Sequence, residues 1–234
     1  MPKIVDHDAR REQIAEAAWQ IIARDGFDKL TMRRIAAEVG TTHSAFARYF
    51  PDKESLLMAA FLRTRELADT TIAARTAGRH GIDALREFCL AVLPFGDNGT
   101  LHARVGLAFW NHAAQHRPFW KTQREHAQRW RTSIMTMLEE AREAGEIPAH
   151  IDLTTASDEI AAANMGWQTI KLLMPEFATD ERMRASLDTL LSSIGSTTHP
   201  SDGRAATHTA SRDTEAPEHP TAPALAHIPE VTAQ

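Results

Sequence analysis

Residues 31–53, which read TMRRIAAEVGTTHSAFARYFPDK, constrain the fold more than any other stretch of the chain. Ile35 and Val39 recur at helical spacing, and Gly40 follows at a position where a left-handed residue can end a helix. Thr42 can then cap a second helix. Two short helices with a tight turn between them, the second with a small polar outer face, are typical of a unit that enters a DNA major groove.

The two motif helices are expected to share a core with a helix that precedes them. Residues 8–26 carry apolar side chains at the spacing of an amphipathic helix, which should stop near Gly26. The core predicted for this three-helix unit consists of Ile14, Ile21, Phe27, Leu30, Ile35, Val39, Phe46 and Phe50. Because a unit of about fifty residues is marginally stable alone, it should pack against the helices that follow and be stabilised by them.

The rest of the chain is predicted to be helical, because apolar residues recur at helical spacing between Gly and Pro breaks. Asp52 can cap a long helix that runs to about residue 74. Later helices are expected over residues 82–95, 100–115, 118–144, 154–174 and 180–194. No segment alternates convincingly at period two, so the predicted class is all-α.

Three regions are predicted from these patterns. Residues 1–51 form the helix–turn–helix domain with a short disordered N-terminus, and residues 52–195 form a larger helical domain. Residues 196–234 contain five prolines, many threonines and almost no large apolar side chains. Such a segment cannot bury a core, so it is expected to be a disordered tail, to which no function is assigned.

Composition narrows the cellular setting. The single cysteine, Cys89, excludes an internal disulfide and a thiolate cluster for zinc, which fits a reducing cytosol. The chain has no run of eighteen apolar residues, and its N-terminus is charged. We therefore expect a cytoplasmic protein with no membrane contact. The net charge of −5 means that any basic, DNA-binding patch must be local.

The motifs G-F-x-x-L-T from Gly26 and Y-F-x-x-K-E-x-L-L from Tyr49, with Ile35-Ala36 and Val39-Gly40 between them, resemble the TetR family of bacterial transcription regulators. This resemblance is specific over residues 8–60. Farther along, to about residue 194, the chain resembles the betaine-regulator (BetI-type) C-terminal domain. The residues that carry this second resemblance are Phe109, Trp110, Trp130, the Ala-Gly-Glu-Ile run at 144–147, Gly166 and Trp167.

The resemblance implies a sequence-specific DNA-binding transcription regulator, a repressor that a small-molecule effector releases from its operator. It implies a homodimer formed through the last two helices, about residues 154–194, with its two recognition helices in successive major grooves of a palindromic operator. It also implies an effector pocket inside the larger domain and a place on the bacterial nucleoid. No enzymatic activity, metal or cofactor is expected.

The candidate DNA-binding residues combine helix N-termini, base-reading side chains and backbone contacts. Free N–H groups at the two motif helices can hold a phosphate beside a threonine hydroxyl, and the first turn of the second helix should reach the bases. An aromatic that the family often carries is replaced by Ala47, so one backbone contact is expected to be missing. The candidates are Thr31, Arg33, Thr42, His43, Ser44, Ala45, Arg48, Tyr49 and Lys53.

Aromatic side chains on several later helices can either fill the core or line a pocket for an apolar, aromatic or cationic ligand. The effector-binding candidates are Phe88, Phe109, Trp110, Trp130, Asn164 and Trp167. Two alternatives to a regulator stay open. One is a helical metal-dependent enzyme that uses His112 and His116, which stand at i and i+4. The other is a helical interaction module that does not bind DNA.

Overall fold

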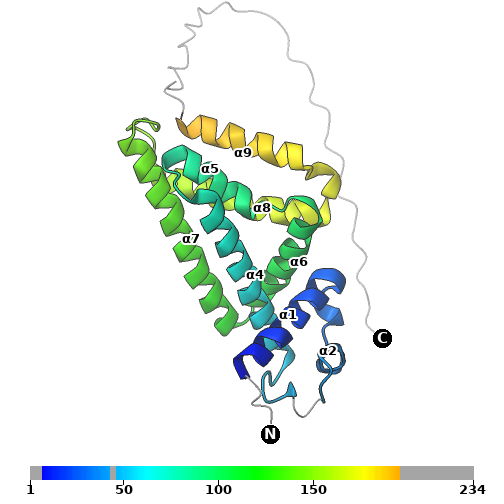
Figure 1. Cartoon of the computed structure of the whole chain (residues 1–234). Coiled ribbons are helices and arrows are strands. Elements are labelled where there is room, and N and C mark those ends of the chain that lie inside the picture. Colours follow the sequence, from blue (N-terminus) through cyan, green and yellow to red (C-terminus); the bar gives the residue numbers. More distant parts are fainter. Residues whose placement is uncertain (1–6, 43–45, 196–234) are drawn as a thin grey trace, which may run out of the picture. The chain divides into compact units, whose positions relative to one another are not determined.

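The computed structural model describes residues 7–42 and 46–195, and all regular secondary structure in these two ranges is helical. In chain order the elements are α1 (His7–Asp25), the 3-10 turn η1 (Phe27–Lys29), α2 (Met32–Glu38), α4 (Lys53–Thr76), α5 (Gly81–Val92), α6 (Gly96–Ala113), α7 (Arg117–Glu143), α8 (Leu153–Leu173), the 3-10 turn η2 (Pro175–Phe177) and α9 (Asp180–Gly195). Within residues 7–195, Figure 1 shows α1 and α2 at one end and α9 at the other. The predicted all-α class is confirmed.

Both ends of α2 follow from its sequence. The Thr31 hydroxyl accepts a hydrogen bond from the Arg34 amide at 3.1 Å and so caps the N-terminus. At the other end, Gly40 has a φ of 63°. Its amide donates to the Ala37 carbonyl and the next amide, of Thr41, donates to the Ala36 carbonyl, which is the pattern that closes a helix around a left-handed residue. The predicted turn after Val39 therefore has the expected glycine geometry.

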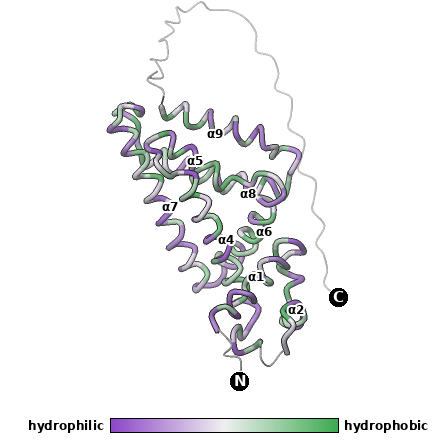
Figure 2. Tube along the Cα trace, in the orientation of Figure 1, coloured by the Kyte–Doolittle hydropathy of each residue, from purple (hydrophilic) through white to green (hydrophobic). Residues whose placement is uncertain are grey.

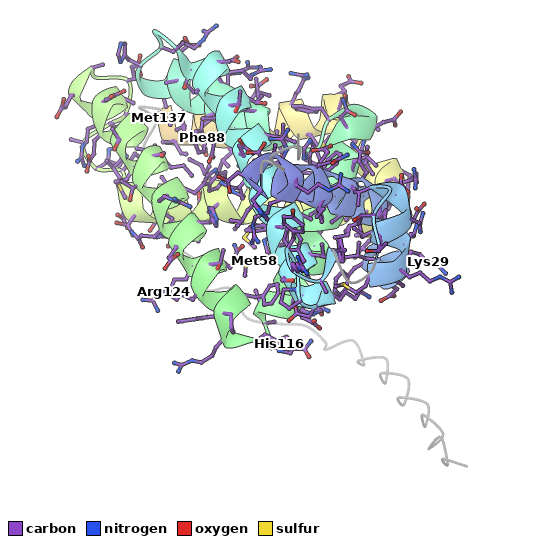
Figure 3. All side chains as sticks on the ribbon, turned by 60° about the horizontal axis from the view of Figure 1, so that its bottom comes forward. Lys29, Met58, Phe88, His116, Arg124 and Met137 are labelled. Atoms are coloured by element: carbon purple, nitrogen blue, oxygen red, sulfur yellow. The ribbon has the colours of Figure 1, made fainter. Side chains whose placement is uncertain are left out.

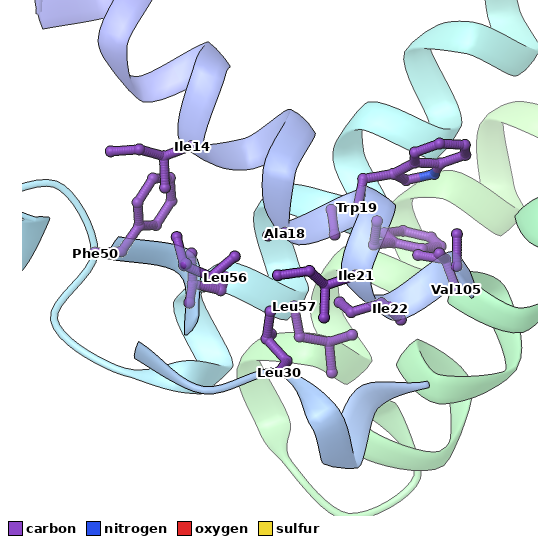
Figure 4. Packing of buried hydrophobic residues seen from close by; sticks show 14 of the residues in the cluster. Ile14, Ala18, Trp19, Ile21, Ile22, Leu30, Phe50, Leu56, Leu57 and Val105 are labelled. Atoms are coloured by element: carbon purple, nitrogen blue, oxygen red, sulfur yellow. The ribbon is translucent and has the colours of Figure 1, made fainter. Parts of the chain in front are cut away.

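The head of the molecule, α1 to the start of α4, packs around one apolar cluster, which Figure 4 shows from close by. Seven of the eight predicted core residues are buried there, and Phe46 and Phe50 are fully enclosed. Phe27 is the exception, since it is only partly buried and packs on the outside of the cluster. Its ring lies 4.9 Å from the ring of His112, so it contacts α6 instead of filling the head.

The head cluster does not stop at the head. It also contains Val105 and Phe109 from α6 and Phe119 from α7, all buried. Arg104, also on α6, donates hydrogen bonds to the carbonyls of Ala23 and Arg24 at 2.5 and 2.7 Å. These carbonyls lie in the last turn of α1, where a cation is favourable. As expected for so small a unit, the head is stabilised by the rest of the helical chain, which is called the body below and runs from α4 to α9. Apart from α4, α6 makes the main contact with α1.

A second buried cluster holds α5, α7, α8 and α9 together, with Leu85, Ile134, Leu138, Ile160 and Met183 among its most enclosed side chains. Figure 2 shows hydrophilic and hydrophobic residues alternating along α7 and α9, as expected for helices with one buried face. None of the helices in residues 7–42 and 46–195 combines the length and apolar character that crossing a bilayer requires. The predicted tail at 196–234 lies outside the described residues.

The helix limits depart most from the prediction at α6, which begins at Gly96 and not at residue 100. The sequence Gly-Asp-Asn-Gly resembles a loop, yet it forms the first turn of this helix. A Cβ atom placed on Gly99 would lie 2.3–2.9 Å from backbone atoms of Pro94. Gly99 is therefore required by the close approach of the first turn to the preceding segment, which single-sequence periodicity does not reveal.

Candidate DNA interface and effector cavity

The two threonines predicted to bind phosphate, Thr31 and Thr42, stand at the start of α2 and after the turn that follows it. Thr31 caps α2, and the Thr42 carbonyl accepts a hydrogen bond from the Phe46 amide at 3.0 Å, as at the start of a second helix. Thr42 itself is exposed. The predicted base-reading residues His43, Ser44 and Ala45 lie outside the described residues, so their role stays a prediction.

The basic candidates of the head differ in how freely they can reach a phosphate. Arg33 and Arg48 are exposed and make no ion pair within the described chain. Arg34 is held by Asp25, with Nη2 2.5 Å from Oδ2. Of the two neighbouring arginines, Arg34 is thus the one with a carboxylate partner, and the DNA role of Arg33 stays a prediction.

Tyr49 and Lys53 carry intramolecular contacts that a DNA role would have to accommodate. Tyr49 is half-buried, with its ring 5.6 Å from that of His7. The Lys53 ammonium lies 4.1 Å from the centre of the Phe27 ring, a cation–π distance. A contact with one ring face occupies only one side of the ammonium, so Lys53 keeps its charge and has N–H groups left to donate. The DNA roles of both residues stay predictions.

The body contains a cavity of about 620 Å³, within the usual range for small-molecule sites. Its wall is built by the middle of α4, the end of α5 and the segment after it, α6, the middle of α7, and α8. Most of the wall is apolar, and Phe61 and Leu90 are among the buried side chains that form it. This is the kind of space that an effector pocket requires.

Three of the six effector candidates line this cavity, namely Trp110, Trp130 and Asn164. The other three stand behind the wall. Phe88 supports Trp130, with ring centres 5.2 Å apart, and Phe109 stacks on Phe61 at 3.6 Å with an interplanar angle of 9°. Trp167 packs beside the second apolar cluster. An effector role for any of the six stays a prediction.

Apart from Asn164, sequence reasoning missed the polar part of the wall. It comes from Thr64, Arg65, Thr70, Thr71 and Arg75 on α4, His102 on α6, Gln123, His126 and Arg131 on α7, and Gln168 on α8. One signal for Arg65 was present. The residue follows Leu57 and Phe61 at a spacing of four, so it shares their side of the helix, and a charge in such a place usually has a partner or a function. No comparable signal marks Gln123.

His126 is a neutral group in this wall. Its ring packs edge-on against Phe61 at 5.4 Å, and Arg129 Nη2 lies 2.7 Å from its Nδ1. Burial, together with the positive charges of Arg65 and Arg129, lowers the pKa of His126 to about 4. The ring is therefore uncharged at neutral pH, and Nδ1 accepts the hydrogen bond from Arg129.

Acidification should destabilise the protein through this histidine. In the unfolded chain the His126 ring would take a proton near pH 6.5, whereas in the folded protein it resists protonation down to about pH 4. The unfolded state binds more protons across that window, so the free energy of unfolding should fall as the pH drops from 6.5 to 4, by at most about 1.4 kcal/mol per pH unit. Urea unfolding at several pH values measures the slope, and His126→Gln should flatten it.

In the His126→Gln variant, the free energy of unfolding should still fall somewhat as the pH drops. Burial also lowers the pKa values of His102 and His112, and these rings act in the same direction. An unchanged slope in the variant would contradict the assignment of a neutral, buried His126.

The histidine pair of the metal-enzyme alternative is built into an aromatic contact. The rings of His112 and His116 lie 5.1 Å apart, and His112 also packs against Phe27 and Phe119. Figure 3 shows His116 and Arg124 at the outer end of α7. Among the described residues, no group of three or more His, Cys, Asp or Glu side chains is placed to hold a metal ion.

Comparison with known proteins gives two family matches. Residues 14–60 match the model of bacterial regulatory proteins of the TetR family, and residues 81–196 match the C-terminal domain of BetI-type transcriptional repressors. Together these matches cover the head and most of the helical body.

Individual relatives agree with these matches. The chain is 41% identical over 66 residues to the HTH-type transcriptional regulator PksA of Bacillus subtilis, which is 28% of this chain and 32% of the relative. It is 38% identical over 93 residues to the HTH-type transcriptional repressor Rv1474c of Mycobacterium tuberculosis, 39% and 47% of the two chains. It is 37% identical over 123 residues to BetI of Stenotrophomonas maltophilia, 50% and 61% of the two chains. The matched part thus spans between a third and three fifths of these relatives.

Among solved structures, a transcriptional regulator from Saccharomonospora viridis in complex with choline superposes with a TM-score of 0.73 at 22% identity, covering 79% of this chain and 96% of that one. A TetR-family regulator from Cytophaga hutchinsonii gives 0.70 at 19% identity, covering 84% and 100%. At this identity the superpositions establish the fold. With the two family matches, they show that the chain belongs to the TetR family of bacterial regulatory proteins and carries a C-terminal domain of the BetI type.

Proposed function

We propose that this protein is a DNA-binding transcription regulator, a repressor whose operator affinity is set by a small molecule in the body cavity. The observation that carries the proposal is the combination of the capped helix α2 and the turn after it, inside the TetR-family match over residues 14–60, with a cavity of about 620 Å³ whose wall includes α4 and α6. These are the helices on which the head packs. The protein would act on nucleoid DNA.

The proposal assigns residues 1–51 to DNA binding and residues 52–195 to effector binding and dimerisation. Homodimer formation through the last two helices is supported by apolar side chains that are exposed in the single chain. Met165 on α8 is 46% exposed, and Leu173 and Met174 at the end of that helix are 66% and 42% exposed. Exposed large apolar side chains at the end of a helix are expected to be covered by a partner. Light scattering of the purified chain should give the mass of a dimer.

A gel retardation assay with the DNA upstream of the chain's own gene tests the proposal. A discrete shift should appear at low salt and should weaken steeply as salt rises, because a few phosphate contacts carry much of the affinity. Choline, the ligand of the Saccharomonospora viridis regulator, is a natural first probe for release of the shifted DNA. If neither that fragment nor any fragment selected from a random library is retarded, the proposal is wrong.

Two substitutions should separate backbone contacts from base reading. Arg48→Ala should weaken binding to every sequence and make the slope of log affinity against log salt less steep by about one, because one phosphate contact is lost. His43→Ala should instead relax the preference at one base pair, by about 1–3 kcal/mol. Binding to a library of operator variants at several salt concentrations measures both effects.

Arg34→Ala is the matched control for these variants, since its guanidinium is held by Asp25. It should leave the salt slope unchanged. An unaltered selected site in His43→Ala would contradict the base-reading assignment, and an unaltered salt slope in Arg48→Ala would contradict the phosphate contact.

A further inference from the structure

The wall of the body cavity carries positive charge only. Three arginines, Arg65, Arg75 and Arg131, line it, and no aspartate or glutamate does so in the described part of the chain. The two lining histidines, His102 and His126, do not add to this charge at neutral pH, because burial lowers both of their pKa values. A cation in this cavity would meet no counter-charge on the wall.

Two of the three arginines are already neutralised from outside the cavity. Arg75 Nη2 lies 2.6 Å from Glu87 Oε2, and Arg131 forms an ion pair with Asp158. Both of these carboxylates belong to neighbouring helices and are absent from the cavity wall. Neither arginine therefore needs a ligand to balance its charge.

Arg65 has only a longer and more exposed ion pair. Its nearest carboxylate is that of Asp69, 3.8 Å from Nη2 and 65% exposed, and its own side chain is only 23% exposed. Its buried Nε has no hydrogen-bond partner among the described residues. The neighbouring Arg129 adds a second positive charge. A mostly buried guanidinium with one distant, solvated carboxylate is an energetically unfavourable arrangement that an anionic ligand would relieve.

Other buried polar atoms of the wall also lack partners in the described chain, namely the indole Nε1 of Trp130 and the amide Oε1 of Gln123. Asn164 Oδ1 is a third such atom. The Trp130 N–H is a second donor that suits an acceptor oxygen, and the two amides suit a hydroxyl or amine on the same molecule. Most of the other lining residues are apolar, so the main part of the ligand should be apolar as well.

We propose that the cavity binds an amphipathic anion: a small-molecule carboxylate with an apolar body, paired with Arg65 and supported by the Trp130 N–H. A planar guanidinium and a carboxylate form two parallel hydrogen bonds, which are among the strongest polar contacts in proteins. This inference rests on the proposed function in that it takes the cavity to be the effector site.

Ligands of matched shape and different charge test the proposal on the full chain. The series comprises naphthylacetate, naphthylacetamide and naphthylmethyl-trimethylammonium. The same three polar groups are also attached to decyl and adamantyl scaffolds, and choline is included. Binding is measured by calorimetry and by quenching of tryptophan fluorescence. For at least one apolar scaffold, the carboxylate should bind at least about tenfold more tightly than the amide, and the cation should bind most weakly.

Arginine variants then locate the charge. Arg65→Gln should abolish the preference for carboxylate over amide while leaving amide affinity within about threefold. Arg131→Gln is the matched control, because it removes an arginine of the same wall that is already paired, and it should keep the preference. Circular dichroism and thermal unfolding check that both variants fold, and Arg65→Lys, which retains the charge without the planar fork, should retain part of the preference.

The proposal is overturned if a cation binds more tightly than its matched carboxylate, if no carboxylate binds at millimolar concentration, or if the preference survives in Arg65→Gln. Its failure is distinguishable from failure of the proposed function. If carboxylates bind but no DNA is retarded, the proposed regulator function is wrong and the proposed anion site stands. If DNA is retarded and only choline or another cation releases it, the regulator function stands and the proposed anion site is wrong.

Discussion

Replacing Phe61 by alanine should lower the free energy of unfolding by about 3–5 kcal/mol, the usual cost of deleting a buried aromatic ring. Phe61 is 3% exposed, stacks face to face on Phe109 and packs edge-on against His126. It belongs to the head cluster and also lines the body cavity. The truncation therefore removes apolar contact on both sides and enlarges a space that is already open. Urea unfolding at one fixed protein concentration measures the change.

Two further variants sharpen this prediction. Leu62→Ala, the next position on the same helix, removes a side chain that is 46% exposed and should change stability by about 0.5 kcal/mol or less. Phe61→Leu keeps most of the volume and should cost clearly less than Phe61→Ala. Equal losses for Phe61→Ala and Leu62→Ala would contradict the view that Phe61 joins the head to the wall of the cavity.

The helices could be predicted from the sequence because their ends are local events. Thr31 and Gly40 fix the limits of α2 through one cap and one left-handed residue, and both are legible in a single sequence. The start of α6 was mislocated because its cause is not local. Gly99 is needed for the approach of a helix turn to Pro94, which only the folded chain brings about.

The cavity was less accessible to sequence reasoning, for a related reason. Aromatic residues at helical spacing indicate that a helix has an inward face, but they do not tell which inward residues meet an open space. Phe109 and Phe88 back the wall, whereas Trp110 and Trp130, each close by in sequence or space, form it. The net charge of the wall depends on ion pairs with residues outside it, such as Arg75 with Glu87. These pairs determine which lining arginines lack a close carboxylate, and the sequence alone does not show them.

The link between cavity and DNA head should depend on Trp19. This residue lies on α1 and is 7% exposed. Its indole Nε1 donates a hydrogen bond to Thr64 Oγ1 at 2.9 Å, and its ring lies 5.2 Å from that of His102. Thr64 and His102 both line the cavity, from α4 and α6. One head residue thus touches two walls of the effector site, so a ligand that moves either helix displaces α1 through Trp19.

Trp19→Phe should therefore reduce the effect of the ligand on DNA affinity while leaving the DNA affinity of the free protein nearly unchanged. The phenyl ring keeps an aromatic side chain next to His102, and the substitution removes the hydrogen bond to Thr64 together with part of the indole volume. Coupling between two sites is typically about 1–3 kcal/mol, a factor of about 5–150 in affinity, and much of that factor should disappear. The measurement is the ratio of DNA dissociation constants with and without saturating ligand. Trp120→Phe, at a side chain that is 47% exposed on α7, is the control and should keep the full ratio.

Thermodynamic reciprocity gives this prediction a second, independent readout. If Trp19→Phe lowers the effect of ligand on DNA binding, it must lower the effect of DNA on ligand binding by the same factor. Ligand titrations of free and operator-bound protein measure that second factor. A full ratio in Trp19→Phe by both routes would mean that coupling runs without this hydrogen bond, through the stacked Phe61 and Phe109 or through Arg104 at the end of α1. Arg104→Met would then be the variant in which the ratio falls.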